Sequence, residues 1–578
     1  MENKNRKDYA TEKWEQEVRE SLQKKKPATL ANLSKADRAA VNAQLAKEAA
    51  VRSQIAIVQA RLTRGVELVR SLVASNAEAM EKHVGELARL LLNSVFASGS
   101  FLVDNKAFAV FLSLSGLATD RLGEYRRLLA AAVLRSYDAP FIADDYLHED
   151  LGELVTRLLH QINFVADQTP LNSTSFSVVA LLLSRVVETS GIGAESVQSD
   201  QAQEQLTLVV NIIAACGGEF QDDAYPRLQT IRDLLAIITN HSKLAKDAAA
   251  ALTDLGAAIK DVASEAEIQE MISGTLSKDS NVRNAALQAL QPVDLTDLDY
   301  SEELWIAVHD ADEQNANLAT HIWEDNGLDI PETYLASLLR YLAHDSAAVR
   351  TSCAAAIADA AEHFPAQVGS TIKGLEDLYV EMAKPLEPEY DRFGMVIPES
   401  VNRADPFEAR VAVAMALSQL TPSITQDLIV PIFEFLIVKG ALGDRHSAVR
   451  KGLLDAGIAL IDLHGAEAVA NLMKMFEDHL GKTGKSTSET DDYIKEAVVI
   501  VSHSGLFLLM PLMRSFSDDS PATWMPTMTA FQRSLTDLST RSTPHRSWCS
   551  PLSPTVCHRW CRACPTKSSI LSTSFSRL

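Results

Sequence analysis

Apolar and polar positions along residues 66–500 follow a helical spacing. Apolar residues recur three and four positions apart in runs of roughly 12 to 20 residues, and short polar joints separate the runs. This spacing places the apolar side chains on one face of an α-helix, whereas the period-two alternation of a half-buried strand is nowhere sustained. Residues 206–216, 231–238 and 244–259 are typical of such runs. The pattern predicts an all-α protein built from a succession of helices.

Four of the polar joints share a phrase in which an Asp precedes an Arg by four to six positions and an alanine-rich run follows. The phrases are Asp279-Ser-Asn-Val-Arg283, Asp345-Ser-Ala-Ala-Val-Arg350, Asp405-Pro-Phe-Glu-Ala-Arg410 and Asp444-Arg-His-Ser-Ala-Val-Arg450. The arginines lie 67, 60 and 40 residues apart, and a weaker phrase at Asp312 divides the first interval almost equally. Periods of about 33 to 47 residues with two helices each are those of HEAT and armadillo arrays. The spacing therefore predicts an α-solenoid of HEAT/armadillo-like helical repeats.

The chemistry of the phrase predicts a ladder of side chains between stacked repeats. An Asp at the start of a helix can accept hydrogen bonds from the free N–H groups there, and its charge suits the positive end of the helix dipole. The small alanines let adjacent helices pack closely, so an Arg one turn into the helix can reach the Asp of the neighbouring unit. We expect the ladder to consist of Arg283, Arg350, Arg410 and Arg450, with Asp279, Asp345 and Asp444 as their caps or partners.

The first 75 residues predict a charged helical arm followed by a long helix. Trp14, Val18 and Leu22 draw one apolar row through a highly charged stretch. From Ser34, a plausible N-cap, apolar residues recur at helical intervals and predict one helix to about Val73. The charged stretch reads either as a solvated helical arm or as a docking arm for a large partner. In the second case the candidate contact is a basic patch, for which a solvated helix end is the alternative: Arg19, Lys24, Lys25 and Lys26.

Loops and composition shifts divide the chain further. A proline-rich stretch, 385–406, and a stretch rich in Gly, Lys, Ser and Thr, 481–491, predict loops within the array. We therefore expect three parts: residues 1–75 as the charged helical arm and long helix, residues 76–500 as a HEAT-like α-solenoid, and residues 501–578 as an irregular, disordered tail.

Charge and hydropathy narrow the class of partner and compartment. Residues 538–578 hold six basic and no acidic residues, so residues 1–537 carry 48 basic against 76 acidic side chains. A body with this excess of acidic side chains repels phosphate groups. It is therefore not expected to bind nucleic acid along its length, and we predict no direct DNA binding. No run approaches the roughly 18 apolar residues of a membrane span, and the charged N-terminus is unlike a signal peptide. We expect a soluble, cytoplasmic protein without a membrane partner.

The last residues differ so strongly from the body that three interpretations are open. Residues 538–578 hold 15 Ser or Thr and no helical period, which is what translation in the wrong frame beyond Val501 would produce. A natural disordered tail is the second interpretation. The third is a zinc site built from Cys561-x-x-Cys564 with Cys549, Cys557 and His558, although a second CxxC pair is missing. The two cysteines of the body, Cys216 and Cys353, lie in apolar helical sequence and are expected to be core residues.

Motifs that suggest catalysis fail on their context. Gly484-Lys485-Ser486 matches the end of a phosphate-binding loop, but the first glycine of that motif would fall at His479, and the loop follows a helix where the motif needs a strand. Gly191-Ile-Gly193 lacks the third glycine of a dinucleotide-binding turn. We therefore predict no enzyme activity, no catalytic residue, no cofactor and no metal ligand.

Several segments resemble one known family in their order and spacing. The segments are WEQEVRESLQKKK and LSKADRAAVNAQLAKEAAVR near the N-terminus, and VPIFEFLIV, ALGDRHSAVRKGLLDAGIALIDLHG and DDYIKEAVVI towards residue 500. Together, over about residues 9–500, they resemble the large HEAT-repeat translational activators of the general amino-acid control pathway, in the part before their elongation-factor-three-like repeats. Members of this family are several times longer than this chain.

The resemblance implies a non-enzymatic scaffold on translating ribosomes. It would help to activate the kinase that phosphorylates the alpha subunit of initiation factor two during amino-acid starvation, together with that kinase's ATP-binding-cassette co-activator. The competing interpretation is a general HEAT-repeat adaptor that binds protein partners unrelated to the ribosome, since one solenoid architecture hosts many functions.

Overall fold

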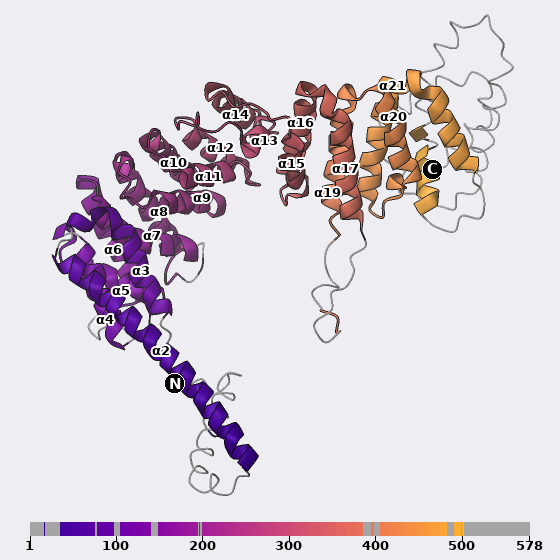
Figure 1. Cartoon of the computed structure of the whole chain (residues 1–578). Helices are drawn as coiled ribbons and strands as arrows, with labels where there is room; N and C mark the ends of the chain where they lie inside the picture. The colour runs from indigo at the N-terminus through magenta and orange to yellow at the C-terminus, as the bar shows by residue number, and fades with distance from the viewer. Residues whose placement is uncertain are drawn as a thin grey trace, which may run out of the picture. The chain divides into compact units, whose positions relative to one another are not determined.

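The computed structural model describes residues 17, 35–75, 78–97, 104–118, 120–139, 148–194, 196, 199–384, 395–397, 405–481, 490–498 and 500–501. In these ranges helices follow one another along the chain. The described residues contain no β-strand, and Val396 forms a single isolated bridge. The predicted all-α solenoid of HEAT-like repeats is confirmed. The helices belong to two compact units, Met1–Ala360 and Ala361–Leu578 (Figure 1).

In the first unit, helices two positions apart in sequence pack side by side. Helix α6 packs on α8, α10 on α12, and α12 on α14, while α10 also contacts α9, which precedes it. This is the arrangement expected when hairpins of two helices stack on one another. The helices are α2 (Lys35–Ser75), α3 (Val84–Ala97), α4 (Asp104–Leu117), α5 (Tyr125–Ser136), α6 (Leu151–Gln168), α7 (Ser173–Thr189), α8 (Asp200–Ala215), α9 (Arg227–Asn240), α10 (Ala245–Ile259), α11 (Glu265–Gly274), α12 (Ser280–Leu290), α13 (Glu302–Val308), α14 (Glu313–Asp325), α15 (Tyr334–Leu338) and α16 (Ala347–His363), which crosses the unit boundary.

The second unit continues the same scheme. Helix α19 packs between α17 and α21, and α20 also lies against α21. The helices are α17 (Val368–Ala383), α19 (Phe407–Gln419), α20 (Gln426–Phe433), the π-helical turn η8 (Glu434–Val438), the 3₁₀ turn η9 (Ala441–Gly443) and α21 (Ser447–Gly481), with helical residues 490–498 beyond them.

The core of the first unit is one continuous apolar cluster from Val66 to Leu328. One glycine shows how closely the repeats approach. A Cβ added to Gly256 of α10 would lie 2.2 Å from the carbonyl oxygen of Ala289 in α12. The absence of a side chain at Gly256 therefore lets the backbones of two stacked helices touch.

The long N-terminal helix is confirmed as α2. Its C-terminal half is amphipathic, and Val66 is buried while Leu62 and Val69 are half-buried on the face that packs against α3 and α4. Residues 42–56 are exposed on all sides, and Figure 1 shows this half extending beyond the helices that the other half contacts. Packing against the core, rather than helix propensity alone, fixes the second half.

Several expectations lie outside the described residues. These are the basic patch at Arg19, Lys24, Lys25 and Lys26, the loop with Gly484, all but three residues of 385–404, and the tail beyond residue 501 with its reading-frame and zinc interpretations. The predicted domain limits at 75 and 500 likewise stay predictions.

Candidate functional site

Arg283 makes a buried ion pair with the next repeat. Its guanidinium donates to both carboxylate oxygens of Asp310, with Nε 2.5 Å from Oδ2 and Nη2 2.9 Å from Oδ1. Both side chains are at least nine-tenths buried. Asp310 lies in the turn before α14, whereas Arg283 lies on α12, so the pair joins two stacked helices. The remaining nitrogen, Nη1, donates to the carbonyl oxygen of Ser277 at 3.0 Å, in the turn before α12 itself.

Arg410 repeats this arrangement in the second unit. The side chain is fully buried, and Nε and Nη2 donate to the two carboxylate oxygens of Asp444 at 2.8 and 3.0 Å. Nη1 and Nη2 also donate to Asp405 at 2.7 and 2.9 Å, and Nη1 donates to the carbonyl oxygen of Met382 at 3.0 Å. All five N–H groups of Arg410 therefore have acceptors, which is the condition under which a guanidinium can be buried.

The surrounding charges balance at this junction. Arg445 donates to both carboxylate oxygens of Asp405, so two arginines, Arg410 and Arg445, face two carboxylates, Asp405 and Asp444. The hydrogen bonds from the two guanidinium groups hold the pKa of Asp405 well below its usual range. Tyr379 donates its hydroxyl proton to Asp444 at 2.8 Å, and burial together with this carboxylate raises the pKa of Tyr379. Asp405 therefore stays ionised and Tyr379 stays protonated.

Arg350 and Arg450 bond within their own turns. Arg350 donates to the carbonyl oxygens of His344 and Asp345 at 2.6 and 2.9 Å, six and five residues upstream. Arg450 donates at 2.7 and 3.2 Å to the carbonyl oxygens of Asp444 and Arg445, at the same two offsets. Arg283 uses these offsets as well, through Ser277 and Lys278. In three of the four phrases, then, the arginine closes the turn that precedes its own helix.

The residue six positions before the arginine makes a further hydrogen bond within the turn, and we call this pattern the turn rule. Its side chain accepts a hydrogen bond from the backbone N–H two residues later, at distances of 2.8 to 3.3 Å. The residues that do so are Ser277, Asp310, His344 and Asp444, of which Asp310 stands six positions before Ala316 in the weaker phrase. Where this residue is an aspartate, its carboxylate is also the acceptor for the arginine of the preceding repeat. In these two junctions the residue at this position therefore supplies the carboxylate of the buried ion pair.

This rule separates aspartates that look equivalent in the sequence. Asp279 stands four positions before its arginine and is the N-cap of α12, accepting from the N–H of Asn281 at 2.9 Å. Asp345 and Asp405 stand five positions before theirs, and Asp444 stands six before. Arg350 differs from the expected link to a neighbouring Asp, because its guanidinium donates to carbonyl oxygens of its own turn.

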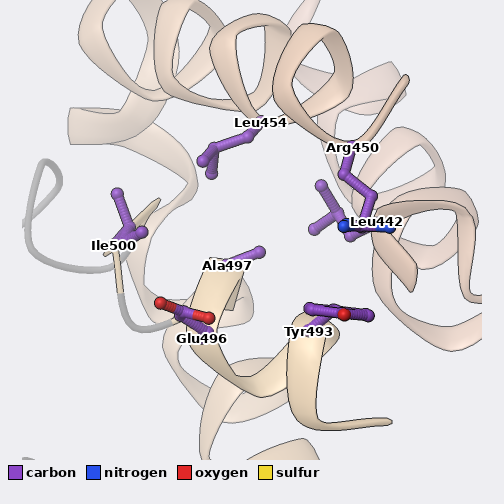
Figure 2. A pocket seen from close by; sticks show the side chains of 7 residues that line it. All are labelled: Leu442, Arg450, Leu454, Tyr493, Glu496, Ala497 and Ile500. Atoms are coloured by element: carbon purple, nitrogen blue, oxygen red, sulfur yellow. The ribbon is translucent and has the colours of Figure 1, made fainter. Parts of the chain in front are cut away.

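Near Arg450 the partner is aromatic. Its guanidinium lies 3.9 Å from the centroid of the Tyr493 ring, which is a cation–π contact. Figure 2 shows Arg450 and Tyr493 beside each other at one end of a small hollow, which is also lined by Leu454, Glu496 and Ile500. The hollow measures about 20 Å³ and has room for about one water molecule. Ligand pockets are larger by more than tenfold, so the hollow is a packing feature of the repeat junction.

The two cysteines of the described residues, Cys216 and Cys353, are buried in the core. Burial raises the pKa of Cys216 to about 11 and raises that of Cys353 further, so both thiols stay protonated. In the part of the chain that the structure describes, no group of three His, Cys, Asp or Glu side chains could hold a metal ion. Within the same part, no helix is long and apolar enough to cross a membrane.

Sequence reasoning missed three members of the junctions. Asp310 was passed over in favour of Asp312, two residues later, and neither Arg445 nor Tyr379 was selected. The sequence does contain a signal for Asp310 and Asp444. Asp444 stands six positions before Arg450, and Asp310 stands six positions before Ala316, which occupies the position of the arginine in the weaker phrase. Tyr379 lies in the preceding helix α17, 65 residues from the carboxylate it contacts, and no spacing rule identifies it.

Comparisons with known proteins agree with this architecture. A family model described as "Stalled ribosome sensor GCN1, HEAT repeats" matches residues 292–504, and a model described as "Fungal GCN1-like, HEAT repeats" matches residues 118–239. The "eIF-2-alpha kinase activator GCN1" of Saccharomyces cerevisiae is 34% identical over 535 residues, covering 87% of this chain and 19% of the relative. The "Stalled ribosome sensor GCN1" of Homo sapiens is 27% identical over 527 residues, covering 85% of this chain and 19% of the relative.

The chain spans about one fifth of the length of these curated relatives. Among solved structures, importin beta is similar at 14% sequence identity with a TM-score of 0.23, covering 92% of this chain and 75% of that one, a likeness too weak to support an argument. The first family model covers the repeats with Arg410 and Asp444, whereas Arg283 lies between the residues that the two models match. The chain belongs to the GCN1 HEAT-repeat family.

Proposed function

We propose that this chain is a non-enzymatic, ribosome-associated scaffold that helps to activate the initiation-factor-two alpha kinase during amino-acid starvation. The observation that carries the proposal is the match over 87% of the chain to a relative named as an activator of that kinase, together with the human relative named as a stalled ribosome sensor. In this proposal the chain acts in the cytoplasm, and its partners are the ribosome, the kinase and the kinase's ATP-binding-cassette co-activator.

The buried ion pairs between successive repeats support a scaffold role. The buried Arg283–Asp310 and Arg410–Asp444 pairs join the second helices of successive repeats. In some proteins, buried and hydrogen-bonded charges specify a unique geometry even where they add little stability, and we propose the same role for these pairs. We propose that the phrase arginines and their aspartates are structural members of the array: Arg283, Arg350, Arg410 and Arg450 with Asp279, Asp345 and Asp444. They keep the repeats in register so that a large partner meets a surface of fixed shape.

For contact with the ribosome we propose the N-terminal arm, through Arg19, Lys24, Lys25 and Lys26. The body of the chain is acidic, so a basic cluster at one end can approach a phosphate-rich particle while the rest is repelled. Such a contact weakens as salt rises, because the counterions that binding releases from the phosphates gain less entropy in a more concentrated salt solution.

The proposal is tested by co-sedimentation of the full chain with ribosomes across a salt series. The test variant replaces Lys24, Lys25 and Lys26 by Glu. The matched control replaces three exposed lysines of the body by Glu, with the same change in net charge: Lys246, Lys373 and Lys451. We expect salt-sensitive binding that the test variant loses and the control keeps.

A second measurement separates the scaffold from a general adaptor. The chain is added to the kinase with ribosomes and uncharged tRNA, and phosphorylation of initiation factor two alpha is followed. A rise in phosphorylation that requires ribosomes supports the proposal. No binding to ribosomes at low salt, with no effect on the kinase, would favour a HEAT-repeat adaptor for other protein partners.

A further inference from the structure

One face of α2 is exposed and apolar although the opposite face of the same turns is packed. The outer row consists of Ile57, Arg61, Arg64, Leu68 and Leu72, spaced four, three, four and four residues apart, so its members lie on one face of the helix. Ile57, Leu68 and Leu72 are 51%, 60% and 41% exposed. We call these five residues the outer row.

A solvent-facing helix surface opposite a packed face is ordinarily polar. Here the packed face contains Leu62, Val66 and Val69, so the helix already has its neighbours at these turns. The exposure of Leu68 is therefore not explained by a missing repeat on the packed side. Large apolar side chains gathered on an exposed face are typical of surfaces that bind protein.

The two arginines of the outer row are available for a partner. Arg52 and Arg70 of α2 pair with Glu48 and Glu67, at 3.6 and 3.0 Å. Arg61 and Arg64 are exposed and, in the described residues, have no carboxylate within salt-bridge distance. Arg61 and Arg64 lie three residues apart, and Ile57 and Leu68 flank them on the same face. The outer row is thus a pair of cations between apolar side chains.

A glycine beside the outer row gives independent support. Gly65 lies in the middle of α2, where glycine weakens a helix relative to alanine. A Cβ added there would meet no atom within 4 Å, so no contact among the residues that the structure describes requires the missing side chain. A glycine at the edge of the row does let the backbone of another helix approach closely.

We propose that the outer row of α2 binds an acidic amphipathic helix of a protein partner. Apolar side chains of that helix cover Ile57, Leu68 and Leu72, and two of its carboxylates meet Arg61 and Arg64. A second copy of this chain is disfavoured, because two outer rows would bring arginines together. A nucleic-acid backbone is disfavoured as well, since phosphates gain nothing from covering Leu68. The proposal goes beyond the ribosome scaffold and does not depend on it.

The test uses the full chain and a designed peptide of 18 residues. The peptide is an alanine-based helix with three leucines spaced to meet the apolar members of the outer row and two glutamates between them. Its binding is measured by fluorescence anisotropy. We expect the variant Arg61→Glu/Arg64→Glu to bind at least about tenfold more weakly, because two ion pairs become two repulsions. The matched control, Lys373→Glu/Lys451→Glu, has the same net charge and should bind as the unchanged chain does.

Two further results would support the assignment. A peptide with lysines in place of the glutamates should bind the Arg61→Glu/Arg64→Glu variant and not the unchanged chain, which shows that the reversed row is folded. Leu68→Asn, a change at a 60% exposed position, should weaken binding of the acidic peptide.

Three results would overturn it. The first is equal binding of the acidic peptide to the unchanged chain and the Arg61→Glu/Arg64→Glu variant. The second is binding of an RNA duplex that the arginine changes abolish and Leu68→Asn leaves intact, which would assign the row to nucleic acid. The third is a concentration-dependent dimer of the chain that Leu68→Asn dissolves, which would assign it to self-association.

Discussion

Replacing Arg410 by Met tests the buried junction most directly. Met has a similar length but no charge, so the change removes five donated hydrogen bonds and leaves the 2%-exposed Asp444 side chain without its cation. Asp405 keeps Arg445, which confines the loss to Asp444. Breaking a buried ion pair from one side costs about 3–5 kcal/mol. The double variant Arg410→Met/Asp444→Asn removes both charges and keeps an acceptor for the N–H of His446, so it should recover part of that loss.

The measurement is hydrogen exchange of the α19 and α21 amides, because a long repeat array does not unfold in one transition. A loss of about 3–5 kcal/mol speeds exchange through local opening by roughly 10²- to 10⁴-fold. The control is Arg350→Met, because Arg350 donates to two carbonyl oxygens of its own turn, and we expect a loss of about 1.5–3 kcal/mol there. Equal effects of the two single changes, or a double variant no better than Arg410→Met, would refute the role given to the pair.

Three other predictions follow from the same structure. Because the arginines lower the pKa of Asp405 in the folded state, the stability it contributes is present above about pH 4 and is lost as pH falls further; Asp405→Asn should flatten this acid dependence of the urea midpoint of the second unit. Burial raises the pKa of Asp233 to about 6, so the first unit should lose stability as pH rises from about 4 to 6, and Asp233→Asn should remove that slope. Gly256→Ala places a Cβ 2.2 Å from a backbone oxygen and should destabilise α10 by about 1–3 kcal/mol. Gly65→Ala meets no atom within 4 Å and should stabilise α2 by about 0.5–1 kcal/mol. Amide hydrogen-exchange rates of the two helices that change in the same direction in both variants would contradict this pair of predictions.

Much of the fold is predictable from the sequence, because apolar residues three and four positions apart mark the helices. The runs 206–216, 231–238 and 244–259 became α8, α9 and α10, and α2 begins and ends within two residues of the expected limits. The repeat architecture followed from the recurrence of one phrase, since a hairpin that cannot bury its face alone must stack on a copy of itself.

Which side chains pair at each junction is harder to predict from the sequence, because the pairing depends on which position of the turn faces the neighbouring repeat. The variable spacing of four to six residues between Asp and Arg hides three different positions: Asp279 is a helix cap, Asp405 is a partner of its own arginine, and Asp444 is a partner of the arginine one repeat earlier. Only the backbone of the turn fixes which position points across the junction. Tyr379 shows the same limit, because its contact with Asp444 depends on how α17 lies against the turn before α21.

The turn rule gives the array junctions of different kinds from one backbone. With Asp at the position six residues before the arginine site, the turn closes on itself and also binds the arginine of the preceding repeat, as at Asp310 and Asp444. With Ser277 or His344 there, the same N–H is accepted and the turn still closes, but no carboxylate faces the preceding repeat. Turn closure and repeat pairing are therefore separate functions of one residue. A hydrogen-bonded ion pair restricts geometry more than apolar packing does, so we expect the junctions with Asp310 and Asp444 to hold their two helices in a single register.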